Sequence, residues 1–205
     1  MTVGVLFWDV DTQHDFMDED GKLAVPGAQQ IVPNLRRLTR FAAEHRIPIV
    51  ASADAHDPDD PEFQEFGQHC VAGTPGQRKI EATCVDDCPT AEPGLLPEQI
   101  NALLNGKLGQ IVIEKQELDV FTVPLADRVL SQLRPERVYV YGVATEYCVL
   151  KTTLGLLERD YDVTVIRDAI KGIDEDDAAA ALQRMEEAGA DFEHTEQVLQ
   201  SLTEA

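Results

Sequence analysis

The sequence predicts an α/β protein with three layers, in which a mostly parallel central sheet carries helices on both faces. Short apolar runs alternate with longer amphipathic segments, and this rhythm is typical of strand–helix–strand crossovers. The 205 residues suffice for one domain with a sizeable core, and 43% of them are hydrophobic. The sequence shows no internal repeat and no linker, so we expect a single domain over residues 1–205.

The N-terminal half is expected to supply the first two strands and the first long helix. The run "VGVLFWDV" at 3–10 is β-rich and largely apolar, as in a strand buried on both faces. Residues 32–45 form a helical pattern whose apolar positions are Leu35, Leu38, Phe41 and Ala42. The run "IPIVASAD" at 47–54 predicts the second strand. Residues 55–98 are irregular and rich in Pro, Gly and Asp, and such a long loop is usually functional.

The C-terminal half continues the alternation of strands and helices. Strands are expected at 109–115, 137–142 and 162–169, with a last short one near 190–192. Helices are expected at 124–133, 145–160 and 174–189. The acidic first turn of the last of these segments suits a helix N-terminus.

Acidic residues dominate the charge of the chain. There are 38 Asp and Glu against 17 Lys and Arg, which gives a formal net charge of -21. Such a surface repels phosphate backbones and anionic lipid headgroups, so we expect neither nucleic acid nor membrane as a partner. No stretch approaches the roughly 18 to 20 apolar residues that span a bilayer. The N-terminus has no basic flank, so we expect no signal peptide and a cytoplasmic location.

Polar and aromatic side chains follow four of the predicted strands, at the carboxyl edge where open parallel sheets bind ligands. They are Asp9, Asp11, Gln13, Asp15 and Phe16 after the first strand, Asp54 and His56 after the second, Glu114 and Lys115 after the third, and Cys148 after the fourth. Taken singly, such residues are commonly turn residues, solvated charges or core cysteines. Their convergence at one edge predicts an enzyme.

The residues at this edge support acyl transfer from an amide or ester through a thioester. A thiol is a good nucleophile as thiolate, which a helix N-terminus, a cation and a base all favour. Cys148 stands in the first turn of a predicted helix, Lys115 would be the cation and Asp11 the base. Amides exposed at the same turn could form an oxyanion hole.

The motifs resemble those of a known family. The segment "DVDTQHDF" (9–16) is similar to the Asp-x-Gln-x-Asp-Phe signature of isochorismatase-like cysteine hydrolases, and "GVATEYCV" (142–149) is similar to that of their nicotinamidases. Weaker matches lie at 23–35, 69–76 and 169–172. The resemblance covers nearly the whole chain in order, and it implies the Rossmann-like, isochorismatase-like fold.

The resemblance also implies a catalytic triad of Asp11, Lys115 and Cys148. Asp11 would take the thiol proton and later deliver it to the leaving ammonia, while Lys115 would hold Asp11 and stabilise the thiolate. The family has a non-proline cis peptide that corresponds to Val143–Ala144 here. The backbone N–H groups of Ala144 and Cys148 would then face the oxyanion.

A divalent metal that binds the pyridine nitrogen is a further implication. The matching ligands are Asp54, His56 and His69, with Glu62 as the best fourth ligand and Glu65 second. These O and N ligands suit zinc first, with iron or manganese possible. The resemblance places Phe16 and Phe66 as walls around the ring, with Gln13 as a further substrate-binding residue.

Two segments depart from the family pattern. The run at 114–122 lacks the aromatic and serine-rich character that many nicotinamidases show after the lysine. The segment 82–96 matches nothing recognisable; its Cys84 and Cys88 are expected to be free loop thiols, since the chain has too few cysteines for a disulfide scaffold. The alternative is a structural zinc site that these two thiols form with His69 and Cys70.

The sequence therefore predicts a cysteine amidohydrolase that converts nicotinamide, or a close analogue, to the carboxylate and ammonia. The first alternative is a related hydrolase for ureido or carbamoyl substrates, although such relatives generally lack the metal set. The second is a binding protein on a degenerate scaffold, against which the intact triad argues. A small-molecule amide is the expected partner, and a homo-oligomer the expected assembly.

Overall fold

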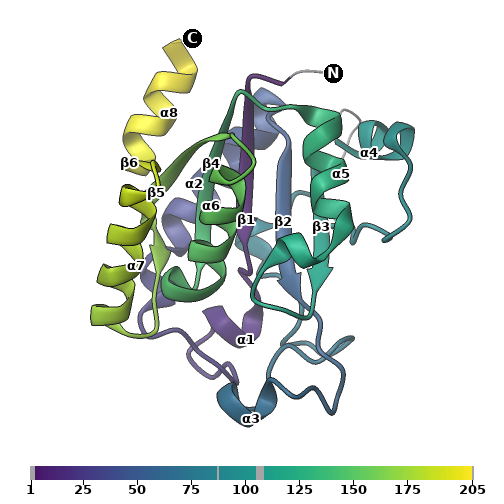
Figure 1. Cartoon of the computed structure of the whole chain (residues 1–205), viewed down its shortest axis with the longest axis vertical. Helices are drawn as coiled ribbons and strands as arrows, with labels where there is room; N and C mark the ends of the chain where they lie inside the picture. The colour runs from purple at the N-terminus through teal and green to yellow at the C-terminus, as the bar shows by residue number, and fades with distance from the viewer. Residues whose placement is uncertain (1–2, 87, 105–108, 205) are drawn as a thin grey trace.

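A computed structural model describes residues 3–86, 88–104 and 109–204 (Figure 1). Its centre is a six-stranded sheet with the strand order β3-β2-β1-β4-β5-β6, and all neighbouring strands are parallel. The strands are β1 (Val5–Val10), β2 (Ile49–Asp54), β3 (Gln110–Lys115), β4 (Arg137–Val143), β5 (Asp162–Lys171) and β6 (Asp191–Glu193). This sheet and its helices confirm the α/β fold class.

Helices cover both faces of the sheet (Figure 1). They are α1 (His14–Met17), α2 (Val32–His45), α3 (Phe63–Phe66), α4 (Pro97–Leu104), α5 (Pro124–Leu133), α6 (Leu150–Leu157), α7 (Glu175–Glu187) and α8 (Thr195–Glu204). Side chains of α2 and α8 share one hydrophobic core, and side chains of α4, α5, α6 and α7 share the other. Within the described part of the chain, no helix is both long and apolar enough to cross a bilayer.

The alternation along β1 divides its side chains between the two cores. Leu6, Trp8 and Val10 pack in the core on the α5 side, whereas Phe7 packs with Tyr139 on the α2 side. All of these side chains are buried, as expected for a central strand with helices on both faces.

The observed elements correct one predicted helix and add helices that were not predicted. The predicted helix at 145–160 is a π-helical turn, Thr145–Val149, followed by α6. The Val149 N–H donates to the Ala144 carbonyl oxygen five residues earlier, which widens this turn. Helices α4 and α8 were not predicted, although both carry apolar residues at helical spacing.

The expectation of free thiols at Cys84 and Cys88 is wrong, because the two residues form a disulfide. Their Cα atoms lie 5.2 Å apart, within the range that a disulfide bridges. The bonded sulfurs are not thiolate ligands, which also excludes the structural zinc alternative. Cys70 and Cys148 are free and buried.

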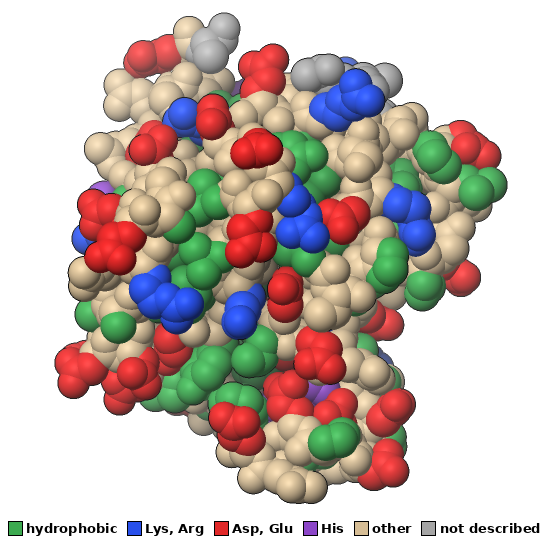
Figure 2. All heavy atoms as spheres, in the orientation of Figure 1, with side chains coloured by type: hydrophobic (Ala, Val, Ile, Leu, Met, Phe, Trp, Pro, Cys, Tyr) green, Lys and Arg blue, Asp and Glu red, His purple; other side chains and the backbone are tan. Residues whose placement is uncertain are grey.

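Acidic side chains are spread over the surface. On the face shown in Figure 2, Asp and Glu are scattered across most of the elements, with Lys and Arg between them. The net charge is thus distributed and does not form one acidic face in this view.

Candidate active site

The ends of three strands bring Asp11, Lys115 and Cys148 into contact. Asp11 follows β1, Lys115 ends β3, and Cys148 lies in the π-helical turn after β4. The Lys115 Nζ lies 2.9 Å from Asp11 Oδ2 and 3.4 Å from Cys148 Sγ. All three residues are buried. The structure therefore assembles the three residues that the sequence placed at separate strand ends.

The Asp11 carboxyl group is held in a position from which it can exchange protons. Its backbone has a φ of 49°, so the chain turns sharply after β1 and directs the side chain into the sheet edge. Ser52 Oγ donates a 2.6 Å hydrogen bond to Asp11 Oδ1. Burial raises the pKa of Asp11 above its usual value, although the nearby Lys115 lowers it. A carboxyl with a raised pKa is suited to act as a base and then as an acid near neutral pH.

Burial favours the thiol form of Cys148 in the free enzyme. Burial raises the pKa of Cys148 well above the ordinary thiol value, and the Lys115 cation offsets this only in part. Burial alone would lower the pKa of Lys115, but Asp11 and Asp54 raise it well above its usual value. The sequence argument had favoured a thiolate. Burial, together with the carboxylates of Asp11 and Asp54, instead leaves the proton on sulfur until a base takes it.

The turn before Cys148 has the backbone geometry that the sequence predicted. The Val143–Ala144 peptide bond is cis, which confirms that expectation. Gly142 has a φ of 123°, and a Cβ there would overlap the carbonyl oxygen of Val10. Only glycine therefore lets β4 lie this close to β1 just before the turn.

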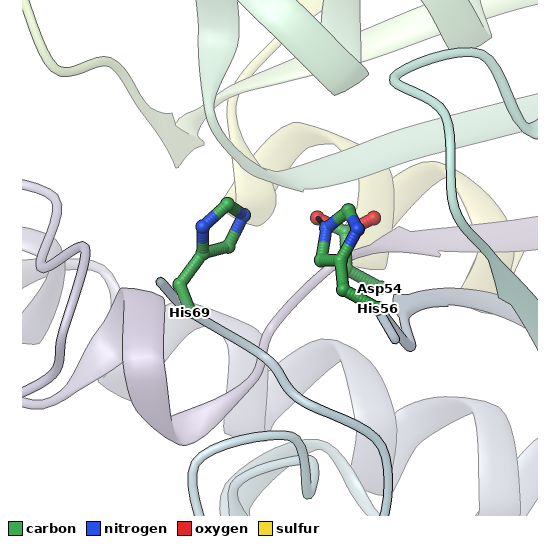
Figure 3. Close-up of side chains that lie close together, drawn as sticks. All are labelled: Asp54, His56 and His69. Carbon is green, nitrogen blue, oxygen red and sulfur yellow. Dashed lines mark ion pairs between the residues drawn. The ribbon is translucent and has the colours of Figure 1, made fainter. Parts of the chain in front are cut away.

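Asp54, His56 and His69 form a compact group of candidate metal ligands (Figure 3). One ligand atom from each lies within 4.8 Å of the others, and all three residues are buried. The His69 Nδ1 hydrogen-bonds the Gly67 carbonyl oxygen at 2.9 Å, which leaves its Nε2 for a metal. The His56 Nε2 is buried without a hydrogen-bond partner. A buried imidazole nitrogen beside a carboxylate fits a divalent cation such as zinc.

Glu62 is better placed than Glu65 to complete this group. Its Oε1 lies 4.0 Å from the Nε2 atoms of both His56 and His69. Glu65 is exposed. The geometry therefore favours Glu62 over Glu65 as the fourth ligand, which is also the order expected from the sequence.

Asp60 supports the ligand group and was not predicted from the sequence. Its Oδ2 lies 3.0 Å from His56 Nδ1, and its Oδ1 accepts the Glu62 backbone N–H at 2.9 Å. Burial lowers the pKa of His56, but the nearby carboxylates of Asp54 and Asp60 outweigh it and raise this pKa to about 9. Metal-bound histidines commonly have such a carboxylate at their second nitrogen. Asp60 follows His56 by four residues, and this spacing is the sequence feature that could have indicated its role.

Asp54 contacts both the candidate metal ligands and the candidate catalytic residues. One carboxylate oxygen of Asp54 contacts Lys115 Nζ, and the other lies 3.8 Å from His56 Nε2. The amide of Gln13 holds Asp54 by its backbone, at 2.7 Å to its N–H and 2.8 Å to its carbonyl oxygen. Gln13 is buried and does not line the cavity beside Cys148, and its role in substrate binding stays a prediction.

A cavity with aromatic and apolar walls lies beside Cys148. Its enclosed part is small, about 20 Å³, and it opens to solvent. Its lining residues are Phe16, Leu23, Asp54, Glu62, Phe66, His69, Leu118, Ala144, Tyr147, Cys148 and Ile173. Phe16 and Phe66 both line this cavity, and their contact with a substrate ring stays a prediction. Leu118, in the segment that departs from the family pattern, was not predicted.

Comparison with known proteins identifies the family. The isochorismatase domain family matches residues 6–197. The chain is 31% identical to the nicotinamidase of Escherichia coli over 198 residues, which cover 88% of this chain and 90% of that protein. It is 29% identical to the nicotinamidase/pyrazinamidase of Mycobacterium tuberculosis over 191 residues, with coverages of 89% and 95%.

A solved structure gives the same result. The pyrazinamidase of Pyrococcus horikoshii in complex with zinc superposes with a TM-score of 0.74 and 31% identity, covering 94% of this chain and 99% of that one. These similarities place the chain among hydrolases that act on amide bonds. It belongs to the isochorismatase family, and within that family it is a nicotinamidase-like amidohydrolase.

Proposed function

We propose that the protein hydrolyses the carboxamide of nicotinamide, or of a close analogue, to the carboxylate and ammonia through a thioester on Cys148. The observation that carries this proposal is the buried contact of Cys148 with Lys115 and Asp11 at the floor of an aromatic cavity. The nicotinamidase relatives support the choice of substrate.

The first half of the proposed reaction forms the thioester. The Cys148 sulfur attacks the carboxamide carbon while Asp11 accepts the thiol proton. The carbonyl electron pair moves to oxygen, where the backbone N–H groups of Ala144 and Cys148 stabilise the charge. When the carbonyl re-forms, the C–N bond breaks and Asp11 returns its proton to the leaving nitrogen, which departs as ammonia.

The second half releases the acid. After ammonia leaves, Asp11 is ionised again. Water attacks the thioester carbon while Asp11 accepts one of its protons. The C–S bond of the resulting tetrahedral adduct breaks, and Asp11 returns the proton to the Cys148 sulfur. Lys115 stays charged throughout, since the two flanking carboxylates raise its pKa. Its charge stabilises the developing thiolate in both halves.

A divalent metal is part of the proposal, with zinc as the first choice and iron or manganese as alternatives. Asp54, His56, His69 and Glu62 would hold it at the cavity wall. When bound, the metal supplies a Lewis acid for the pyridine nitrogen of the substrate. The zinc complex of the Pyrococcus relative supports this choice.

The charges of the cavity favour a neutral amide over the carbamoyl alternative. Among the described residues, no Lys or Arg lines the cavity, whereas the carboxylates of Asp54 and Glu62 do. Ureidoacrylate-type and related carbamoyl substrates carry a carboxylate, for which the described lining offers no cationic side chain. Nicotinamide and pyrazinamide carry no such charge.

An ammonia-release screen tests this proposal. The zinc-loaded protein should release ammonia from nicotinamide and pyrazinamide much faster than from ureidoacrylate-type and other carbamoyl substrates. Faster turnover of the carbamoyl substrates, or full activity after the metal is removed by chelation, would favour the alternative hydrolase.

Location and assembly complete the proposal. A cytoplasmic location and a homo-oligomer are proposed from the sequence, and sedimentation of the purified protein measures the second. Production of a pyridine carboxylate from the amide would fit a role in NAD salvage.

A further inference from the structure

A second buried ion pair lies next to the triad and takes no part in the chemistry proposed above. The Lys79 Nζ donates to Asp9 Oδ2 at 2.8 Å and to Thr12 Oγ1 at 2.6 Å. Thr12 Oγ1 also donates to Asp9 Oδ1 at 2.9 Å and lies 2.7 Å from Thr83 Oγ1. We call these four residues the Lys79 network. The side chains of Asp9 and Lys79 are 0% and 3% exposed, so the pair is out of solvent.

The Lys79 network holds the chain on both sides of Asp11. Asp9 stands two residues before Asp11, and Thr12 directly follows it. Asp11 has a left-handed backbone conformation, which a non-glycine residue keeps only when its surroundings enforce it. A single ammonium group bonds both flanking side chains. A displacement of the Asp11 backbone would therefore break these bonds.

The segment around Lys79 also supports the second carboxylate of the site. Gln13 pairs with Lys79 in an antiparallel bridge. The Gln13 side-chain amide donates to the Gln77 carbonyl oxygen at 2.6 Å and to the Asp54 carbonyl oxygen at 2.8 Å. Both carboxylates that contact Lys115 are therefore fixed by the same stretch of chain.

We infer that Lys79 is a positioning residue, which acts through Asp9 and Thr12 to keep the Asp11 carboxylate within reach of the Cys148 thiol. A buried ion pair adds little stability compared with apolar side chains of similar volume, so its presence here fits orientation better than stabilisation. The inference rests on the proposed function, because it takes Asp11 as the base.

Two variants separate positioning from stability. Lys79→Met leaves the Asp9 carboxylate buried without a counter-ion, so both the melting temperature and kcat should fall. Asp9→Val combined with Lys79→Met removes both charges, so the melting temperature should recover. Its kcat for nicotinamide should nevertheless stay about 100-fold below wild type, with KM within about threefold, because a small displacement of a catalytic group has this size of effect. Lys151→Met, on the exposed face of α6, is the matched control and should change neither.

A second readout keeps this test independent of the substrate. Alkylation of Cys148 by iodoacetamide needs the same base, so its rate should fall in both Lys79 variants and not in Lys151→Met. Recovery of kcat and alkylation together with the melting temperature in the double variant would overturn the inference. If the wild-type protein is alkylated but releases no ammonia, the proposed function fails, and the alkylation rates alone decide the role of Lys79.

Discussion

The protonation of Asp11 determines the pH range of the proposed reaction. Asp11 accepts the thiol proton only when ionised, and burial raises its pKa above the usual carboxyl value. We therefore expect kcat/KM to have its full value above this raised pKa and to fall as the pH decreases through it. Ser52 donates a hydrogen bond that lowers the Asp11 pKa.

The Ser52→Ala variant tests this relation. Loss of the hydrogen bond should raise the Asp11 pKa further and move the acidic limb of the kcat/KM profile to higher pH. Ser131→Ala, at an exposed position on α5, should leave the limb in place. A limb that moves to lower pH in Ser52→Ala, or does not move, would contradict the role of Asp11 as base.

The two glutamates of the α3 region give a matched pair for the metal site. Glu62→Gln should weaken zinc binding by about tenfold or more, because the variant loses a charged oxygen ligand 4.0 Å from both imidazoles. Glu65→Gln should bind zinc like the wild type, since Glu65 is exposed. Calorimetric zinc titrations of both variants measure the difference. Equal affinities would remove Glu62 from the ligand set.

At the residue scale, the strand pattern located the groups at strand ends and the family resemblance located His69 and Glu62 in the long loop, but neither indicated Lys79. Asp11, Lys115 and Cys148 could be found because parallel strands share one carboxyl edge. Lys79 could not, because its partners Asp9 and Thr12 lie about 70 residues away and meet it through loop pairing. The raised pKa of the Cys148 thiol could not be predicted either, since it depends on burial.

At the scale of elements, the Cys84–Cys88 disulfide closes a short loop directly after the 3₁₀ helix Glu81–Thr83. Its loop is anchored by Gln110, which donates to the Thr83 carbonyl oxygen at 2.9 Å and accepts the Val85 N–H at 2.7 Å. Thiol titration of the unfolded, unreduced protein should find two thiols, and prior reduction should raise this to four. Four thiols without reduction would show that the bridge is absent.

Removal of the bridge should lower stability without abolishing the fold. The Cys84→Ser/Cys88→Ser double variant should lose about 2 kcal/mol of unfolding free energy, because the loop that the bridge closes is short. Urea denaturation measures this loss, with the reduced wild-type protein as the control. A reduced wild type as stable as the oxidised protein would contradict this estimate.

The sequence predicted the strands better than the helices. Strands β1 to β5 could be recognised because continuous apolar runs are typical of buried parallel strands. Helix α4 was not predicted because it follows the irregular, Pro-rich region. The π-helical turn was not predicted because apolar spacing does not distinguish it from an α-helix. In α8, Val198, Leu199 and Leu202 carried a helical pattern that could have predicted it.

The net charge acts on the molecule as a whole. A formal charge of -21 spread over one chain destabilises the compact state by self-repulsion, which salt screens. We therefore expect added sodium chloride to raise the melting temperature. Nicotinamide is uncharged, so its KM should change little over the same range. A KM that rises steeply with salt would indicate that charge contributes to substrate binding.

The central claim is that Cys148 is the nucleophile of an amide hydrolysis, and ammonia release from nicotinamide by Cys148→Ala tests it most directly. We expect this variant to fold and bind zinc like the wild type but to lose at least about a thousandfold in kcat, because no other group can form the acyl intermediate. The Cys84→Ser/Cys88→Ser variant, whose sulfurs lie outside the site, should retain its activity. Turnover by Cys148→Ala within tenfold of the wild-type rate would contradict the thioester mechanism.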